Sequence, residues 1–405
     1  MLSADLDDIL EDVFERVSKS RIFKNRDVLM PDFLPNRLPH REEQIRKVAS
    51  VLAQALKGYR PNNLFLYGLT GTGKTAVVKL VTKKLSEKAR ERGVRLKVAF
   101  VNTKRDDTPY RVLSKLLENI GFRVPPTGIA TAQLYANFKR LLDKRDLLLI
   151  IVLDEIDYHV KKHGDDLLYK LTRINEELRN SKVSIIGITN DVNFTSWLDP
   201  RVKSSLSEEE LVFPPYTAPQ LEDILRDRAQ MAFEDEALEE GVIPFCAALA
   251  ARERGDARKA LDLLRVAGEL AEREGRNKVT TEHVKKAWEQ IEKDRVIEVV
   301  RSLPLHSKLI LLAIAKLTKD GTVTYTGEVY KLYKEFTSDL GIETLTLRRV
   351  SDLIGELDML GLISTQVVSR GKRGMTRVIN LESDYKSVIK GLKDDPRVAE
   401  IAGLI

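Results

Sequence analysis

The motif that decides the fold is Gly68-Leu-Thr-Gly-Thr-Gly-Lys-Thr75, which fits the pattern G-x-x-x-x-G-K-[ST]. A short apolar run, Leu64–Tyr67, comes directly before it and a helical pattern follows, which is the strand–loop–helix setting of a phosphate-binding loop. Glycines let backbone N–H groups curl around phosphate oxygens, and the helix N-terminus adds a favourable dipole. We expect Lys74 to reach the β and γ phosphates and Thr75 to ligate Mg²⁺. The residues expected to hold the nucleotide phosphates are Gly68, Leu69, Thr70, Gly71, Thr72, Gly73, Lys74, Thr75 and Ala76.

The second motif is the apolar run Leu147–Leu153, which reads as a buried strand and ends in Asp154 and Glu155. Hydrolysis of a phosphoanhydride by in-line attack needs a holder of Mg²⁺ and a carboxylate that orients the water. We assign Asp154, with Thr75, to the metal and Glu155 to the attacking water. Taken alone, the run could also be a core strand followed by an acidic helix start. The phosphate loop favours the catalytic interpretation.

The order of the patterns along the chain predicts three domains. From 63 to 190, short β-rich runs alternate with helical patterns, which indicates a mostly parallel sheet covered by helices. An amphipathic helix, Leu6–Val17, is expected before it. Residues 217–296 read as helices alone, broken near Gly241 and Gly275. After Leu303 come helices and then two strands, Leu362–Val368 and Met375–Leu381, as in a winged helix. The expected domains are an α/β base (1–216), an all-α lid (217–296) and a winged-helix domain (297–405).

Composition excludes several classes of protein. No apolar run reaches the roughly 18 residues that a membrane span needs. The first ten residues carry Asp5, Asp7 and Asp8, which is the wrong charge for a secretion signal. The single cysteine, Cys246, rules out an internal disulfide framework and cysteine-cluster metal sites. These features indicate an intracellular protein that does not enter a membrane. The net charge of +6 permits nucleic-acid binding without demonstrating it.

The C-terminal hairpin and the helix before it are the expected DNA-binding elements. The turn between the two strands is rich in basic residues, which suits contact with phosphate or the minor groove. The helix Thr346–Leu360 should bury one face, formed by Leu347, Val350, Leu353, Ile354 and Leu357. Its outer face is basic at the start and acidic later, so its N-terminal end should enter the groove. The expected contacts are Thr344 just before the helix, Thr346, Arg348, Arg349 and Ser351 within it, and Arg370, Gly371, Lys372, Arg373 and Arg377 in the wing.

The order of these motifs resembles that of AAA+ ATPases. Asn190 ends a strand and resembles the sensor-1 residue of that class. Arg258, in Gly255-Asp-Ala-Arg258, resembles the sensor-2 arginine that reaches the γ-phosphate from the lid, and Asp256 should cap the helix that carries it. Nearly the whole chain resembles the archaeal origin-recognition and cell-division-control initiator family. The most specific matches are Leu38-Pro-His-Arg-Glu-Glu-Gln44, Tyr67–Thr75, and Leu198–Ser204 leading to Phe213-Pro-Pro-Tyr216.

The resemblance implies a replication initiator: a slow ATPase that uses ATP or ADP with Mg²⁺ as a switch, binds double-stranded origin DNA and helps load the minichromosome maintenance helicase. Its place would be the chromosome, in the cytoplasm of an archaeal cell, and other initiator paralogues are expected partners. Adenine would lie against Leu38, Pro39, His40, Arg41 and Tyr216. The segment 102–128 resembles an initiator-specific insertion that contacts DNA, with Lys104, Arg105 and Thr127 as candidates. Arg201 resembles an arginine finger. Ser204-Ser205-Leu206 departs from the Ser-Arg-Cys of clamp loaders, so slow turnover is expected.

Three alternatives stay open at this stage. A clamp-loader subunit would lack the hairpin Leu362–Leu381 and end in a helical collar. A helicase or remodelling motor is disfavoured because a clear finger and a pore-loop signature are missing. An ATP-gated transcription regulator fits the basic wing as well as an initiator does, and only the Leu198–Tyr216 signature and the insertion favour the initiator.

Overall fold

The structure, a computed structural model, describes residues 14, 21–125, 127–191, 193–206, 208–319, 322–369 and 375–403. The chain divides into two compact units, Met1–Val284 and Lys285–Ile405. Each unit has its own hydrophobic core, and each is described by itself.

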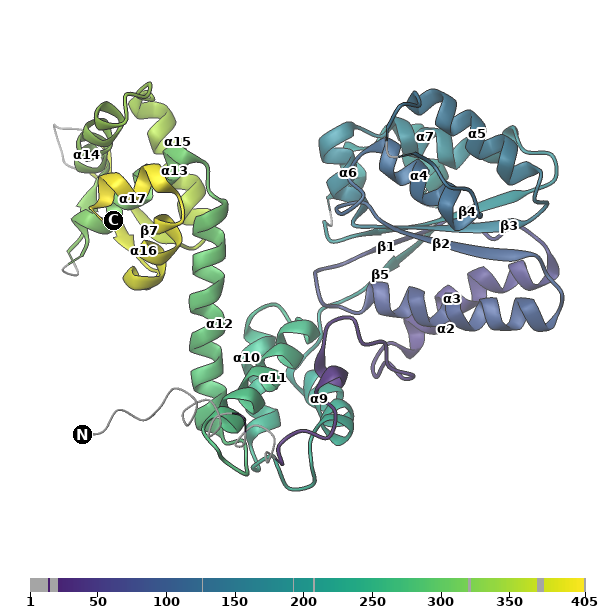
Figure 1. The fold of residues 1–405 in the computed structure, drawn as a ribbon, viewed down its shortest axis with the longest axis horizontal. Coiled ribbons are helices and arrows are strands. Elements are labelled where there is room, and N and C mark those ends of the chain that lie inside the picture. Colours follow the sequence, from purple (N-terminus) through teal and green to yellow (C-terminus); the bar gives the residue numbers. More distant parts are fainter. Residues whose placement is uncertain are drawn as a thin grey trace. The chain divides into compact units, whose positions relative to one another are not determined.

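A five-stranded parallel sheet forms the centre of the first unit (Figure 1). Its strands are β1 (Leu64–Tyr67), β2 (Leu96–Asn102), β3 (Leu148–Asp154), β4 (Lys182–Thr189) and β5 (Glu209–Val212), in the order β2-β3-β4-β1-β5. The runs Leu64–Tyr67 and Leu147–Leu153 predicted β1 and β3 to within one residue at each end. The prediction missed β5, an edge strand of only four residues, two of them glutamates. The composition of this segment does not indicate a strand, and it forms one because it pairs with β1.

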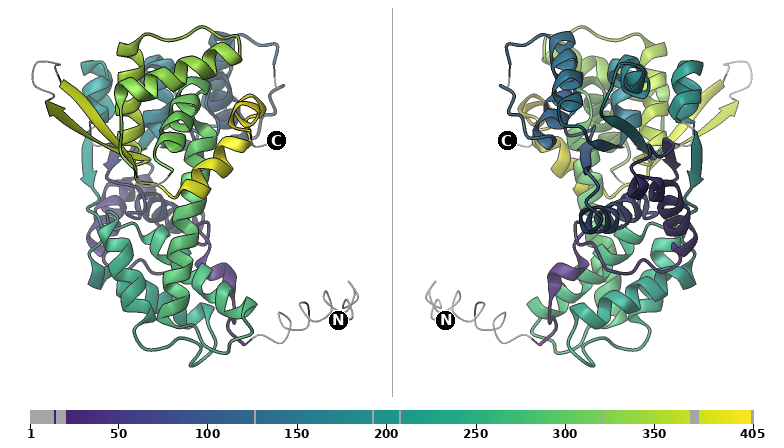
Figure 2. Two further views of the ribbon diagram at one scale, coloured as in Figure 1. Left: turned by 90° about the vertical axis from the view of Figure 1, so that its left-hand side faces the viewer. Right: turned by 90° about the vertical axis from the view of Figure 1, so that its right-hand side faces the viewer.

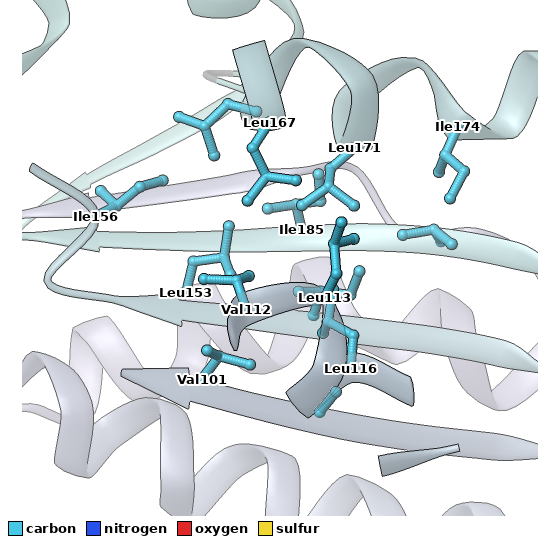
Figure 3. Packing of buried hydrophobic residues seen from close by; sticks show 14 of the residues in the cluster. Val101, Val112, Leu113, Leu116, Leu153, Ile156, Leu167, Leu171, Ile174 and Ile185 are labelled. Carbon is cyan, nitrogen blue, oxygen red and sulfur yellow. The ribbon is translucent and has the colours of Figure 1, made fainter. Parts of the chain in front are cut away.

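Helices cover both faces of this sheet, with α2 and α3 on one side and α4 to α7 on the other (Figure 1). Strand β3 is buried along its whole length, and its side chains alternate between the two cores. Leu149, Ile151 and Leu153 face one core, part of which is shown in Figure 3, and Ile150 and Val152 face the other. The helices of this layer are α2 (Glu42–Leu52), α3 (Lys74–Glu91), α4 (Pro109–Asn119), α5 (Thr131–Asp143), α6 (Ile156–His163), α7 (Asp166–Arg173) and α8 (Pro200–Leu206), with 3-10 turns η2 (Ala53–Lys57), η3 (Ile174–Glu176) and η4 (Phe194–Trp197).

The lid follows the sheet in the same unit and consists of helices, as predicted. They are α9 (Ala218–Ala232), α10 (Val242–Arg252) and α11 (Ala257–Arg273), and the breaks fall near Gly241 and Gly275 as expected. The segment before α2 packs on this lid through the 3-10 turn η1 (Arg26–Leu29). The ring of Phe23 packs against that of Phe233 in a tilted arrangement, with 4.8 Å between ring centroids. The helix expected over Leu6–Val17 lies outside the described residues, apart from Phe14.

The second unit has the winged-helix arrangement of helices and an antiparallel hairpin. Strands β7 (Ile363–Ser369) and β8 (Met375–Leu381) pair in register and project beyond the helices (Figure 2). A short third strand, β6 (Thr324–Tyr325), pairs with β8. Helix α12 (Thr281–Ser302) runs unbroken through the domain boundary expected at 296/297. The other helices are α13 (Leu305–Leu317), α14 (Thr326–Asp339), α15 (Leu347–Met359), α16 (Tyr385–Lys393) and α17 (Pro396–Ala402).

One residue of the predicted inward face of α15 points outward. Val350, Leu353, Ile354 and Leu357 are buried as predicted, whereas Leu347 is 48% exposed, so its prediction was wrong. Leu347 is the first residue of the helix. Helical side chains lean toward the N-terminus, so at this position Leu347 leans past the end of the helix instead of over the core.

Candidate functional site

The loop between β1 and α3 forms a tight phosphate cradle. Helix α3 begins at Lys74, directly after Gly73, so the first N–H groups of the helix face the loop. Gly71 has φ of +67°, and a Cβ at this position would lie 1.7 Å from Oδ1 of Asp256 in the lid. The loop and the lid therefore approach each other so closely here that only glycine fits at position 71. The Ala257 N–H also donates to the Gly71 carbonyl at 3.2 Å.

Lys74 lies inside this loop. Its Nζ donates to the carbonyl oxygens of Gly68 at 2.8 Å and Leu69 at 2.7 Å. Burial lowers the pKa of Lys74 to about 8; the nearby Asp154 opposes this shift and Arg258 contributes to it. The lysine is a cation at neutral pH, which is the charge state that a phosphate contact requires.

Thr75 and Asp154 are brought together by the ends of α3 and β3. The Thr75 hydroxyl donates to Oδ2 of Asp154 at 3.1 Å. Burial raises the pKa of Asp154, and the bond from Thr75 opposes that shift. No group of three or more His, Cys, Asp or Glu side chains among the described residues could hold a metal ion. This hydroxyl and carboxylate do fit Mg²⁺, which takes few protein ligands and completes its shell with phosphate oxygens and water.

Glu155 is held by two groups that the sequence interpretation did not connect to it. Its Oε1 accepts from Asn102 Nδ2 at 3.2 Å, and Lys104 Nζ lies 3.8 Å from its Oε2. Asn102 ends β2 beside Asp154, the last residue of β3. The contact could have been predicted from the sequence only with the strand order, because the carboxyl ends of neighbouring parallel strands meet at one edge of a sheet. The sequence did not show that β2 and β3 are neighbours.

A cavity of about 420 Å³ lies over this cradle, between the sheet, the segment before α2, and the lid. Asn190, at the end of β4, and Arg258, at the start of α11, both line it. The predicted N-cap role of Asp256 is confirmed, since its carboxylate accepts from the Arg258 and Lys259 N–H groups. The predicted site residues that line the cavity are Leu38, Pro39, Gly71, Thr72, Gly73, Lys74, Thr75, Ala76, Asp154, Glu155, Asn190, Tyr216 and Arg258.

Other predicted residues lie near the cavity without belonging to its wall. Gly68 and Leu69 face Lys74 through their carbonyls, and Thr70 follows them in the loop. His40 contacts Asp223 of the lid at 2.8 Å, and Arg41 is buried behind the loop. Residues 30–37, which precede Leu38, also line the cavity.

Arg201 lies on α8 and away from this cavity. Its Nε and Nη2 each donate to one carboxylate oxygen of Asp199 at 3.0 Å, and its guanidinium lies 5.3 Å from the centroid of Tyr169. The bond from Arg201 lowers the pKa of Asp199 to about 2. The side chain is exposed and does not line the cavity.

The candidate DNA contacts belong to both units of the chain. Lys104, Arg105 and Thr127 are exposed on loops of the first unit. In the second unit, the Thr346 hydroxyl caps α15, Arg348 is exposed, and Arg349 lies 3.4 Å from Glu356. Thr344 exchanges a hydrogen bond with Thr337 at 2.7 Å. The Arg377 guanidinium donates to the Ser351 carbonyl at 3.1 Å, so it ties β8 to α15. Arg370, Gly371, Lys372 and Arg373 lie outside the described residues.

A phosphate loop between strand and helix that a helical lid covers is the arrangement of AAA-type ATPases, here joined to a winged helix. Family profiles agree: the AAA ATPase domain matches residues 37–186, the Cdc6 AAA+ ATPase-type lid domain 222–289, and the CDC6 C-terminal winged helix domain 298–391. The chain belongs to the family of ORC1-type DNA replication proteins. The AAA domain and this membership indicate ATPase activity.

The chain matches its relatives over almost their full length. It is 55% identical over 396 residues to ORC1-type DNA replication protein 1 of Sulfurisphaera tokodaii, covering 97% of this chain and 98% of that one. The match to the Aeropyrum pernix protein of the same name is 54% over 394 residues, covering 97% and 100%. The structure of the Aeropyrum pernix ORC1 protein in complex with DNA is similar at a TM-score of 0.85, covering 95% of this chain and 100% of that one. Cdc6p from Pyrobaculum aerophilum shares the fold, at 22% identity and a TM-score of 0.59. Among the described helices, none is both long and apolar enough to cross a membrane.

Proposed function

We propose that this chain is a replication initiator that binds double-stranded origin DNA under the control of ATP and ADP, and that helps recruit or load the replicative helicase. The observation that carries the proposal is the 54% identity, over nearly the whole chain, to an ORC1 protein whose structure is in complex with DNA. The cavity proposed to bind the nucleotide lies between base and lid, so a bound ATP or ADP would contact both. This position supports the proposed control by nucleotide.

The nucleotide would be held with its phosphates in the loop around Lys74 and with Mg²⁺ at Thr75 and Asp154. The ion neutralises charge on the phosphates. Glu155 is the carboxylate that would hold the proton of the attacking water, and Asn190 and Arg258 face the same cavity. Asn102 and Lys104 both contact Glu155, so they orient its carboxylate.

Turnover is proposed to be slow, so that the bound nucleotide acts as a switch. The departure of Ser204-Ser205-Leu206 from the Ser-Arg-Cys finger of clamp loaders supports this, and Arg201 pairs with Asp199 on the surface. A finger would have to come from another subunit. Whether Arg201 serves a neighbour in this way depends on assembly with initiator paralogues, which we propose as partners.

DNA is proposed to meet the N-terminal end of α15 and the wing. Thr346, Arg348 and Arg349 lie in the first turn of α15, where helix N-termini meet the major groove in winged helices. The later residue Glu356 pairs with Arg349 and would repel phosphate. Lys104, Arg105 and Thr127 would add a second contact from the first unit.

The proposed domains are the base (1–216), the lid (217–296) and the winged helix (297–405). The family matches to 37–186, 222–289 and 298–391 support this division. The proposed partners are origin DNA and the minichromosome maintenance helicase. The proposed place of action is the chromosome, in the cytoplasm of an archaeal cell.

The test is genome-wide crosslinking of the protein to DNA, set beside a map of replication start sites. Arg348→Ala removes an exposed arginine at the proposed reading end, and Arg397→Ala removes an exposed arginine on α17 as the matched control. Peaks at origins that weaken in Arg348→Ala and persist in Arg397→Ala would support the initiator. Peaks at promoters with none at origins would replace it with an ATP-gated transcription regulator.

A further inference from the structure

Arg41 is the largest fully buried side chain among the described residues of the first unit, at 2% exposure. It directly precedes α2, in the segment expected to contact adenine. Its partners are three main-chain carbonyls and two aromatic rings rather than a carboxylate. A buried guanidinium is expensive unless every donor is used, so such a residue is placed for a specific purpose.

One edge of Arg41 holds the phosphate loop. Its Nε donates to the Thr72 carbonyl at 2.8 Å, and Thr72 is itself completely buried. The Thr72 hydroxyl donates to the Leu69 carbonyl at 2.8 Å, and Leu69 also accepts from Lys74. The position of Arg41 is thus linked through Thr72 to the part of the loop that holds Lys74.

The other edge of Arg41 holds the hinge that leads to the lid. Its Nη2 donates to the Pro214 carbonyl at 2.6 Å, and its guanidinium lies 3.7 Å from the ring centroid of Tyr216. Tyr216 lines the nucleotide cavity, and its N–H donates to the Gly255 carbonyl of the lid at 3.3 Å. Helix α9 starts at Ala218, only two residues beyond Tyr216.

We propose that Arg41 is a positioning residue that couples the phosphate loop to the hinge at 214–216, so that the nucleotide state sets the position of the lid. A lid that swung at this hinge would have to break the bond to Pro214 or the stack on Tyr216, or else shift Thr72 with it. Two elements that share one rigid side chain move together. The inference rests on the nucleotide site within the proposed function, and it is independent of DNA binding.

Only arginine has the geometry for this role. Its planar fork donates to the loop and to the hinge at once while its face stacks on a ring. Lysine keeps the charge but has a single ammonium group, which reaches one carbonyl cluster or the other. Arg41→Lys is therefore the informative variant, and Arg41→Met is the stronger one.

The experiment measures ADP affinity and the distance between base and lid in the full chain. Spin labels go on Lys83→Cys, exposed in α3, and Glu240→Cys, exposed in the lid. The natural Cys246 is buried and stays unlabelled in the folded protein. The matched control is Arg60→Lys, because Arg60 also donates to a carbonyl, that of Val183, but at the amino ends of the strands. Calorimetry measures affinity, and pulsed electron paramagnetic resonance measures distance with and without saturating ADP.

We expect saturating ADP to shift the base–lid distance in the otherwise unmodified protein and in Arg60→Lys. In Arg41→Lys the shift should disappear although the site is filled, and ADP affinity should fall ~10-fold, as for one lost charge-assisted hydrogen bond. A residue that only stabilised the fold would lower the melting temperature and the affinity but leave the shift at saturation intact. That outcome, or an unmodified lid that ADP does not move, would overturn the proposal. If Arg41→Met does not fold, Arg41→Lys alone decides.

Failure of this inference is distinct from failure of the proposed function. A chain that binds ADP and origin DNA without lid movement would remain an initiator. A chain that moves its lid but does not bind origins would keep the role of Arg41 and lose the proposed function.

Discussion

Gly71→Ala tests how closely the phosphate loop packs against the lid. Left-handed backbone costs a non-glycine residue roughly 1–2 kcal/mol, of which the reduced entropy of the unfolded chain returns about 0.4–1 kcal/mol. The added Cβ would lie 1.7 Å from Asp256, so the carboxylate must leave its position as the cap of α11, worth ~1 kcal/mol. The bond from Ala257 to the Gly71 carbonyl contributes about 1 kcal/mol more. The expected loss of stability is therefore about 3 kcal/mol.

Gly275→Ala is the matched control, because Gly275 has nearly the same φ, +66°, and an added Cβ there has nothing within 4 Å. It should lose only the net backbone strain, about 1 kcal/mol. Urea unfolding followed by circular dichroism gives both values, and ADP binding should weaken only in Gly71→Ala. Equal losses in the two variants would refute the argument. A double-mutant cycle is a second test. If Gly71→Ala costs as much stability in the Asp256→Ala background as in the unmodified protein, the two residues are not coupled and the argument is refuted.

Three further predictions concern the charge at the phosphate loop, the metal pair and α15. Because the pKa of Lys74 is about 8, ADP affinity should fall as pH rises from 7 to 9.5, where the free protein loses this cation; calorimetry should show no such fall in Lys74→Met. Thr75→Val should weaken nucleotide binding in Mg²⁺ about 10-fold or more and leave binding in EDTA unchanged; equal weakening in both would contradict metal ligation. Leu347→Ala should change stability by less than about 0.5 kcal/mol, whereas Leu353→Ala should cost roughly 2–5 kcal/mol in urea unfolding; similar losses would place Leu347 in the core after all.

Much of the first unit could be read from the chain because its signals are local. The stretch from Leu64 to Thr75 comprises a strand, a turn and a helix start, and the structure has them in that order. Strand β3 is apolar up to Asp154 and is covered on both faces, as the continuous apolar run predicted. Asp256 caps α11 through atoms two and three residues away, so its role followed from sequence neighbours. Signals of this kind depend on positions within one turn or one strand.

The errors and omissions share the opposite property. Strand β5 is short and acidic, and only its neighbour β1 makes it a strand. Asn102 meets Glu155 because β2 and β3 lie side by side, although the two residues are 53 positions apart. Leu347 fits the apolar spacing of α15 but lies at the end of the helix, where the core no longer reaches.

The sequence alone determined the class of protein. It showed a phosphate loop, a carboxylate pair after a buried strand, a helical lid and a winged helix, and each of these is encoded by residues close together in the chain. The tertiary structure alone decided the role of Arg41. The residues near Arg41 in the chain do not indicate that its guanidinium joins Thr72 to Pro214, because those partners are 31 and 173 residues away. Local spacing specifies which elements form, while the burial of one charged side chain among distant carbonyls depends on how the finished elements pack.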